Sequence, residues 1–468
     1  PIPEAITPIA GPFTQYKTFF LRNALAKLRN SEYMLLSLLL PPALAAIVSI
    51  FLRFAIALDL EATGYNLYSN PNLASFFLMC ILASLFFGLT LSCEDIVRDR
   101  LMIVRERFMG LSIRCYYNAK IAFLVFISAY QALTYTLVGS AIMELSGMGF
   151  HLWLTLYLIS FYGNMMGLII SSALRSVVAI YILVPFLIIP QILFSGLVVR
   201  FDHLNPKFSS QEVVPLAGEV MASRWAGEAL IVHFYTKNHY NKPFFPIDMQ
   251  ESHLRFRLLN LIPTLQNQLP NYPYNDSISA NINRELTLNG INLLSLGINT
   301  QPPYLQGIDD DLDFIFAAND YITAARNELT QRYSRVRRLK DDGILELYPN
   351  TPQGRNDFQR ARNLFHNRSI DDLVRSRFYP TQLAIENNRF IQKVDPIFII
   401  PPSKWGRSHF YAPYKPLGDF LIETYWFNAA VLGLMILFTY LILLSNVLST
   451  SAQWRSVRLS FRIANMKR

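Results

Sequence analysis

Six long apolar stretches divide this chain of 468 residues. They cover residues 33–58, 72–92, 116–143, 150–173, 177–199 and 420–447. A helix needs about 20 apolar residues to cross a bilayer, and each stretch meets that length. The pattern predicts an all-α polytopic membrane protein with six transmembrane helices.

The segment between the fifth and sixth stretches is more polar. Residues 236–415 are typical of a water-soluble, mostly helical domain, whereas residues 200–235 are apolar enough to form a re-entrant or interfacial external segment. The clearest helix predicted within residues 236–415 covers 312–339 and ends before Gly343. Its apolar stripe is Ile315, Ala318, Ile322, Ala325, Leu329 and Val336. The other predicted divisions are a connecting segment (1–31), helices one to five (32–199), helix six (416–448) and a basic tail (449–468).

The charges beside the apolar stretches predict the orientation in the membrane. Lysine and arginine flank the first stretch on its N-terminal side, fill the loop between stretches two and three, and recur in the tail. The opposite short loops, 59–71 and 144–149, contain neither. By the positive-inside rule both ends of the chain are expected in the cytoplasm, with residues 200–415 outside.

Two cytoplasmic segments are predicted to be amphipathic helices. Residues 14–29 place apolar side chains on one face and cations on the other, as in a helix lying on a membrane surface, although packing on a soluble domain is an alternative. In residues 93–111, Ser92 and Asp95 resemble a capping box. Val97, Leu101, Val104 and Phe108 form one stripe, and Gly110 ends the helix. Mixed charges around that stripe favour a protein partner, and a solvated loop helix is the alternative.

Composition excludes some classes of protein. The chain is 52% hydrophobic and 16% charged, which disfavours an ordinary soluble protein. The net charge of +9 comes largely from membrane-flanking segments and lacks interleaved aromatic residues, so no nucleic acid is expected as a partner. None of the three cysteines lies in 232–415, which suits a bacterial envelope protein. With the apolar spans, the expected location is the inner membrane of a bacterium. No catalytic motif or metal-ligand spacing stands out, and the Asn367–Ser369 glycosylation pattern arises often by chance.

Small residues in the fourth stretch predict close helix packing. Gly163, Gly167 and Ser171 recur every four residues, with Asn164 beside them as a candidate interhelical hydrogen-bond donor.

Together these features resemble the membrane domain of type-2 ABC exporters, closest to the G subfamily. RERFMGL (105–111) resembles the family's coupling helix, FSGLVV (194–199) the end of its fifth span, and SRWAGEAL (223–230) its re-entrant segment. The likeness covers about 1–235 and 415–450. The external region is far longer than is usual in the family and lacks the family's loop cysteines.

The resemblance implies partners and cofactors. An ABC ATPase domain that binds ATP and Mg is expected, either upstream of Pro1 or as a separate subunit, because no GxxxxGK[ST] motif occurs here. A second membrane domain, in a homodimer or heterodimer, membrane lipids and an envelope partner for residues 236–415 are also expected.

The resemblance also implies roles for residues. Coupling to the ATPase is expected of Glu94, Arg105, Glu106, Arg107 and Gly110, although Glu106 could instead pair only with an arginine of its own chain. The substrate pathway is expected along Met79, Leu82, Phe86, Ile188, Ile189 and Ile192, and an outer gate at Leu197 and Val198. These apolar side chains could equally face lipid. An apolar pathway favours a lipid-like or amphiphilic cargo.

Three functions are compatible with these patterns. The leading hypothesis is an ATP-driven exporter. A structural or signalling complex that uses the same conformational change without cargo is the alternative. A channel or secondary carrier is less favoured, because few ionisable residues lie deep in the apolar stretches.

Overall fold

The computed structural model describes residues 10–54, 65–108, 110–205, 207, 210, 212–274, 276–284, 311–377, 382–386 and 389–445. Helices dominate these residues, and the strands form two small antiparallel hairpins, β1–β2 and β3–β4. The predicted all-α polytopic class is therefore confirmed. The basic tail 449–468 and residues 1–9 lie outside the described residues.

Within the described residues, five helices are long and apolar enough to cross a membrane. They are α2 (Ser31–Leu52), α3 (Leu73–Ser92), α5 (Ile113–Met143), α6 (Gly149–Ala173) and α16 (Thr424–Ser445). The remaining predicted span, the fifth, corresponds to α7 (Val177–Leu193), an apolar helix of 17 residues. At 1.5 Å per residue, α7 is about 25 Å long, slightly less than a bilayer core of about 30 Å. The chain is a multi-pass membrane protein.

The end of α7 differs from the prediction that this span reaches residue 199. Pro190 cannot donate a backbone hydrogen bond, and the helix ends three residues later at Leu193. A turn follows in which Gly196 has φ +76, a left-handed conformation that favours glycine. The residues 194–199 therefore leave the helix axis.

Small residues bring α3 and α6 into close contact. A Cβ atom added to Gly163 would lie 2.6 Å from the Leu85 carbonyl oxygen, and one on Gly88 would lie 2.0 Å from that of Ser160. Gly167 lies against Ser92 and Leu89 in the same way. Glycine at these positions lets the two backbones approach, as expected for small residues in membrane helices.

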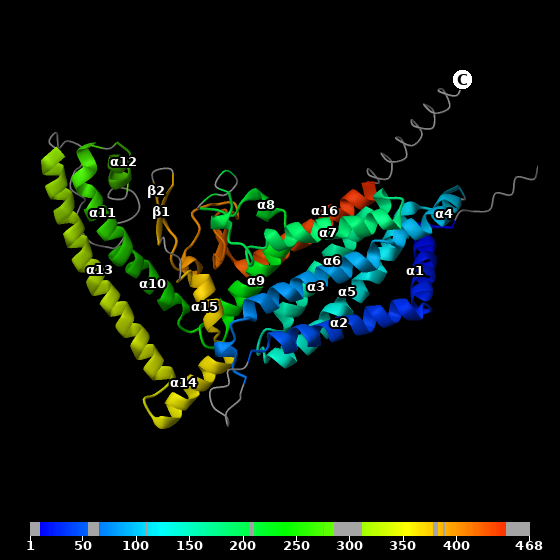
Figure 1. Ribbon diagram of the computed structural model, residues 1–468, viewed down its shortest axis with the longest axis horizontal. Helices are drawn as coiled ribbons and strands as arrows, with labels where there is room; N and C mark the ends of the chain where they lie inside the picture. The colour runs from blue at the N-terminus through cyan, green and yellow to red at the C-terminus, as the bar shows by residue number, and fades with distance from the viewer. Residues whose placement is uncertain are drawn as a thin grey trace, which may run out of the picture.

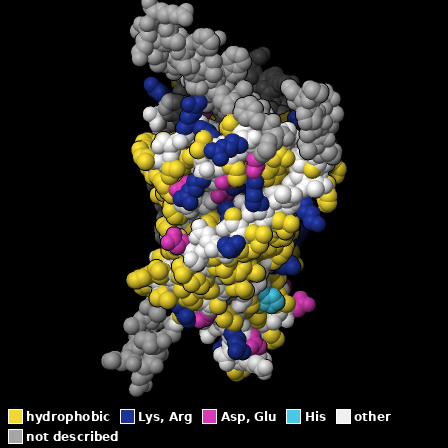
Figure 2. Space-filling model, turned by 90° about the vertical axis from the view of Figure 1, so that its right-hand side faces the viewer, with side chains coloured by type: hydrophobic (Ala, Val, Ile, Leu, Met, Phe, Trp, Pro, Cys, Tyr) yellow, Lys and Arg dark blue, Asp and Glu magenta, His cyan; other side chains and the backbone are white. Residues whose placement is uncertain are grey.

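One end of the helix bundle carries α1 (Pro12–Leu28) and α4 (Asp95–Phe108) (Figure 1). There α1 runs across the bundle rather than along it (Figure 1). Its leucines Leu21, Leu25 and Leu28 are exposed, as a membrane-surface helix requires. Figure 2 looks at this end and shows Lys and Arg side chains gathered with acidic ones beside a mainly hydrophobic area.

The residues that follow α7, up to β4, lie at the opposite end (Figure 1). We call them the external region after the prediction. It contains α8 (Leu216–Glu219), α9 (Ala222–Lys237), α10 (Phe245–Phe256), a π-helical turn (Arg257–Leu261), α11 (Ile262–Gln268), α12 (Asp276–Arg284), α13 (Asp311–Leu347), α14 (Pro352–Phe365) and α15 (Arg368–Arg375). Its hairpins are β1 (Leu383–Glu386) with β2 (Arg389–Gln392), and β3 (Tyr414–Leu417) with β4 (Phe420–Glu423). The hairpin β3–β4 occupies the start of the segment predicted as helix six, so α16 begins only at Thr424.

Helix α13 is longer than predicted. It continues through Gly343 and ends at Leu347, close to Pro349. Lys340 explains part of this extension, because its ammonium lies 2.7 Å from Asp248 and 2.9 Å from Glu251 on α10. The predicted stripe does form the buried face, with Ala318, Ile322, Ala325 and Leu329 in one apolar core.

A buried asparagine ties the external region to the membrane helices. Asn367 accepts a hydrogen bond from the Ile370 amide at the start of α15. Its side-chain nitrogen donates to the carbonyl oxygens of Leu67 (2.7 Å) and Asn70 (2.8 Å), just before α3. Because its amide oxygen and its amide nitrogen both form hydrogen bonds and its side chain is buried, Asn367 has a structural role in the folded chain rather than that of a glycosylation site.

Candidate functional site

The start of α4 is held by residues from other helices. The Ser171 hydroxyl, at the end of α6, accepts hydrogen bonds from the amides of Ile96 (3.0 Å) and Val97 (3.1 Å). The predicted capping box is wrong, because Ser92 still belongs to α3 and its hydroxyl donates to the Gly88 carbonyl at 2.9 Å. A residue 75 positions away in the sequence caps α4 instead.

Two ion pairs join α1 to α4. Arg22 forms a two-pronged pair with Glu106, near the end of α4. The Lys27 ammonium lies 2.9 Å from the Asp95 carboxylate at its start. We call these four residues the α1–α4 joint. Glu106 therefore does pair with an arginine of its own chain, and its expected contact with an ATPase stays a prediction.

Burial and nearby charge shift the pKa of Lys27 in opposite directions. Burial works to lower the pKa of Lys27, but Asp95 and the Tyr33 hydroxyl act against it, and the pKa is raised overall. Lys27 is therefore a cation at neutral pH. A helix lying on a membrane surface would direct this cation toward lipid headgroups. The structure instead turns it toward α4, because Asp95 offers an anion in a place with little water.

Further contacts connect α4 to two membrane helices, α5 and α6. The Lys120 ammonium of α5 lies 2.8 Å from Asp99, which also accepts a hydrogen bond from the Tyr116 hydroxyl at 2.8 Å. Arg100 donates to the carbonyl oxygens of Ser172 (3.0 Å) and Leu174 (3.1 Å) at the end of α6. Such a cation at a helix C-terminus also complements the helix dipole.

Glu94 connects α4 to the fifth membrane helix. It accepts a hydrogen bond from the Tyr181 hydroxyl of α7 and pairs with Arg98. A displacement of α4 would therefore act directly on α5, α6 and α7.

One face of α4 remains exposed. Leu101 is 75% exposed and Val104 45%, with Arg105 exposed beside them. The predicted stripe is thus divided: Val97 packs against the main core, and the next two members point away from the bundle. The Arg107 and Phe108 side chains lie outside the part of the chain that the structure describes.

Gly110 ends this helix geometrically. It has φ +82, and the following amide, of Leu111, donates to the Glu106 carbonyl at 3.2 Å. This is the closing bond of a helix C-terminus with glycine in the left-handed region.

The predicted pathway residues lie on the outer face of the two helices that carry them. Met79 and Phe86 are the exposed large residues of α3, and Leu82 is half-buried between them. On α7, Ile189 is exposed, while Ile188 and Ile192 are half-buried. The helices α3 and α7 are in contact, and the exposed members of this set are all apolar.

The two predicted gate residues differ in their surroundings. Leu197 packs against α9: a Cβ atom added to Gly227 would lie 2.9 Å from the Leu197 side chain. Val198 is exposed. Of the predicted packing residues, Gly163 and Gly167 lie in the α3–α6 contact, and Asn164 donates to the Ser128 hydroxyl of α5 at 2.7 Å.

A second charged group lies fully buried around α9. This helix packs against α3, α6 and α16, and all its residues from Ala222 to Tyr235 are buried. One Glu228 oxygen accepts hydrogen bonds from Lys415 (2.7 Å) and Asn428 (2.8 Å) and lies 3.5 Å from Arg224. We call these four residues the α9 cluster. Burial, followed by the nearby Arg224, lowers the pKa of Lys415 to about 8.

The α9 cluster could not be found by pattern alone. The motif SRWAGEAL contains Arg224 and Glu228 four residues apart, which resembles an ordinary exposed helix pair. Lys415 comes from the hairpin before α16, and its ammonium lies 4.8 Å from the centre of the Trp225 ring. Only the folded chain brings the three charges together.

Comparison with known families identifies the part of the chain that contains α4. Residues 14–217 match the family model of the ABC-2 type transporter. These residues form an ABC-2 type transporter domain. No curated protein sequence matched the chain. The ABC-2 transporter domain runs from α1 to the start of α8, and it includes the α1–α4 joint. Membrane domains of this family work with ABC ATPases.

The ABC-2 assignment leaves the external helices and α16 outside the matched range. Arg224, Glu228 and Lys415 all follow residue 217. The contact of α9 with α3, α6 and α16 nevertheless makes the later residues part of the same helix bundle.

Proposed function

We propose that this chain is the membrane domain of an ATP-driven exporter that moves a lipid-like or amphiphilic cargo outward. An ABC ATPase, fused or separate, would bind at the α1 and α4 end, where it would supply ATP and Mg. A second membrane domain would complete the pathway. On this proposal the end with α1 and α4 faces the cytoplasm of a bacterium, and residues 200–415 lie outside.

The observation that carries the proposal is the set of contacts around α4. One helix is bonded to α1 through the α1–α4 joint, to α5 through Lys120, and to α7 through Glu94. A partner that moved α4 would therefore move several membrane helices together. This is the mechanical requirement for coupling an ATPase to a pathway.

The exposed face of α4 supplies a docking surface of the right chemistry. Leu101 and Val104 form a small apolar centre, and Arg98 and Arg105 are exposed beside it. Interfaces commonly combine an apolar centre with a polar rim. In this arrangement Glu106 keeps α4 on α1, and Arg98 and Arg105 are exposed charged residues available to the ATPase.

The cargo class follows from the surface shared by α3 and α7. Met79, Phe86 and Ile189 present no charge there. A polar solute that crossed such a surface would lose hydration without gaining hydrogen bonds, whereas an amphiphile would not.

Substitution of Leu101 tests the proposal. Leu101→Glu places a charge in the centre of the docking surface, so the assembled transporter should lose most of its bound ATPase and its ATP-dependent transport. Leu216→Glu is the matched control, because Leu216 on α8 is 71% exposed at the opposite end. Transport is measured as ATP-dependent movement of fluorescent phospholipid and fluorescent fatty acid between leaflets of proteoliposomes.

Two results would contradict the proposal. Full ATPase binding and transport in a well-folded Leu101→Glu variant would remove α4 as the docking helix. ATP hydrolysis by the wild-type complex with no movement of either probe would instead favour a structural or signalling complex.

A further inference from the structure

Three exposed apolar side chains lie on one face of the β3–β4 hairpin. Leu417 and Phe420 are directly opposite each other in the hairpin, and Trp405 pairs with Leu417 from the other side. Residues directly opposite in antiparallel strands place their side chains on the same face of the sheet. Trp405 is 81% exposed, Phe420 78% and Leu417 48%. We call these three residues the hairpin face.

The backbone around the hairpin face is held by hydrogen bonds. The Gly406 amide donates to the Pro416 carbonyl at 2.7 Å, and the Gly418 amide donates to the Lys404 carbonyl at 2.8 Å. These bonds keep residues 404–406 alongside β3. Gly418 has φ +65, and glycine takes this conformation readily at the first position of a two-residue turn. The hairpin face is therefore a preformed surface.

The hairpin face lies beside the start of a membrane helix. Strand β4 ends at Glu423 and α16 begins at Thr424, without a loop between them. Gly406 packs so closely on the Phe427 ring, in the first turn of α16, that a Cβ atom added to this glycine would overlap the ring. Trp405 is the sequence neighbour of Gly406, so it lies next to that first turn.

The length of α16 places its first turn near the edge of the bilayer core. Its 22 residues cover about 33 Å, close to the core thickness of about 30 Å. Trp426, also in the first turn, is exposed, and exposed apolar side chains such as Leu434 and Leu441 follow along the helix. Tryptophan is enriched at membrane–water boundaries, and both Trp405 and Trp426 lie at this boundary.

Charged residues around the hairpin face set its depth in the membrane. Lys404 and Arg407 are close to Trp405 in the sequence, Asp419 is in the hairpin turn, and all three charged side chains are exposed. Charged side chains are costly in the hydrocarbon core but keep their hydration among lipid head groups. The hairpin face therefore suits the layer of head groups and upper acyl chains rather than the centre of the bilayer.

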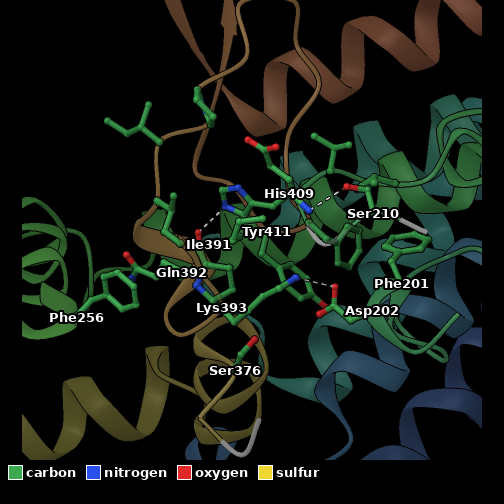
Figure 3. Close-up of a pocket in the computed structure, with 18 of the residues that line it drawn as sticks. Phe201, Asp202, Ser210, Phe256, Ser376, Ile391, Gln392, Lys393, His409 and Tyr411 are labelled. Carbon is green, nitrogen blue, oxygen red and sulfur yellow. Dashed lines mark hydrogen bonds and ion pairs between the residues drawn. The ribbon is translucent and has the colours of Figure 1, made fainter. Parts of the chain in front are cut away.

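Packing of the neighbouring segments fixes the hairpin face in position. Figure 3 shows residues of the segment 396–411 around a cavity of about 460 Å³, where the His409 ring forms a hydrogen bond of 2.8 Å to a backbone carbonyl of the same segment. Phe410 meets the Phe201 ring edge to face, with ring centres 5.2 Å apart. In β3, Lys415 belongs to the buried α9 cluster. The hairpin face cannot turn away from α16 without breaking these contacts.

We propose that the hairpin face inserts into the bilayer leaflet on the side of the external region, with lipid head groups and upper acyl chains as its partner. Its continuity with the start of α16 favours lipid over a second copy of this chain or a soluble protein, because the exposed side of α16 already meets lipid at this level. The proposal is independent of the proposed transport and of the side of the membrane that the external region faces.

Spin labels on the full chain in phosphatidylcholine vesicles test the insertion. A nitroxide is attached at Phe420→Cys in a chain that carries Cys115→Ser. Its collisions with oxygen, which concentrates in lipid, and with a water-soluble nickel chelate are measured by electron paramagnetic resonance.

Two further label positions serve as references. Leu434→Cys, in the middle of α16, is the lipid reference. Phe316→Cys is the matched water reference, because Phe316 is 69% exposed on α13, one of the helices farthest from the membrane helices (Figure 1). We expect the oxygen-to-nickel collision ratio at Phe420 to be several-fold higher than at Phe316 and lower than at Leu434.

A label at Trp405→Cys tests whether the hairpin face inserts as a unit. Its collision ratio should also be high, and adding Phe420→Asp should lower it several-fold, because a carboxylate draws the face toward water. Adding Phe316→Asp instead should leave the ratio unchanged. Because Phe420 is largely exposed, its substitution removes little packing from the folded chain.

Three results would overturn the proposal. A collision ratio at Phe420 equal to that at Phe316 would place the hairpin face in water. Low collision rates with both reagents would show that protein covers the face, as in a contact between two copies of the chain. An unchanged ratio at Trp405 in a well-folded Phe420→Asp variant would show that these side chains do not insert together.

Discussion

The α1–α4 joint and the α9 cluster both hold distant segments together with charges, but only one of them is fully buried. In the joint, the Arg22 side chain is 40% exposed and Glu106 16%. In the cluster, Arg224, Glu228 and Lys415 are all fully buried. An exposed pair exchanges its partner for water at little cost, whereas a buried charge that loses its partner is strongly destabilised.

This difference assigns mechanical roles to the two ends of the bundle. On the proposed function, the Arg22–Glu106 pair of the joint can open and close when a partner acts on α4, while the less exposed Lys27–Asp95 pair, 11% and 13% exposed, keeps the start of α4 on α1. The cluster fixes α9 and the β3–β4 hairpin against α16, so on the proposed function this end stays constant while the end with α1 and α4 moves. The predictions below test this contrast, starting with the largest expected effect.

Glu228→Gln should cause the largest loss of stability. It leaves Lys415 without its bonded anion and Arg224 with only the more distant Glu219, 3.6 Å away, and breaking a buried ion pair in this way costs about 3–5 kcal/mol. Thermal unfolding in detergent measures the effect. Glu423→Gln is the matched control, because Glu423 pairs with Lys237 at the surface, and such pairs contribute about 0–1 kcal/mol. Similar losses of stability in the two variants would show that the buried charges of the α9 cluster contribute no more to stability than a surface ion pair does.

Gly163→Ala should have the next largest effect. The added methyl group would lie 2.6 Å from the Leu85 carbonyl oxygen, so α3 and α6 must separate slightly, and overpacking of this kind costs about 1–3 kcal/mol. Gly433→Ala on α16 has open space around the new methyl group and should be neutral or slightly stabilising. The comparison fails if the two variants unfold at the same temperature.

The Arg22–Glu106 pair should contribute little to stability. A double-mutant cycle with Arg22→Gln and Glu106→Gln should give a coupling energy of about 0.2–1 kcal/mol that shrinks in high salt. ATP-dependent transport should nevertheless fall in both single variants, because α1 no longer follows α4. A coupling energy above about 3 kcal/mol would make the joint as fixed as the cluster.

Lys27 of the α1–α4 joint and Lys415 of the α9 cluster should affect the pH dependence of stability differently, and this is the smallest of the expected effects. Lys415 has its pKa lowered to about 8 from 10.5, so between these values the unfolded chain binds more protons and stability rises with pH. Lys27 has its pKa raised above 10.5 and stays protonated in both states over the same range.

The test compares unfolding temperatures from about pH 7.5 to about pH 10. The difference between wild type and Lys415→Met should change in favour of the wild type as pH rises, whereas the difference between wild type and Lys27→Met should stay level. A level difference for Lys415→Met would contradict the lowered pKa.

The sequence predicted the parts of the molecule that depend on local pattern. Apolar stretches located the membrane helices, and the stripe from Ala318 to Leu329 located the buried face of α13. Where prediction failed, tertiary contacts decided. Ser171 caps α4 in place of Ser92, and Lys340 bonds to α10 beyond the predicted helix end.

The candidate site was predictable only in outline. A charged helix between two apolar stretches was evident, but the Arg22–Glu106 and Lys27–Asp95 pairs join residues 84 and 68 positions apart. No spacing rule connects such residues, because their contact depends on how α1 crosses the bundle.

Distances between spin labels test the contrast most directly. One pair, Arg29→Cys with Arg105→Cys, spans the α1–α4 joint, and another, Leu216→Cys with Trp405→Cys, lies at the opposite end; all four positions are exposed, and Cys115 is replaced by serine. Labelled chains are diluted with unlabelled ones in the complex with its ATPase. Trapping ATP should shift the first distance and leave the second unchanged, and a constant first distance with a shifted second one would contradict the account.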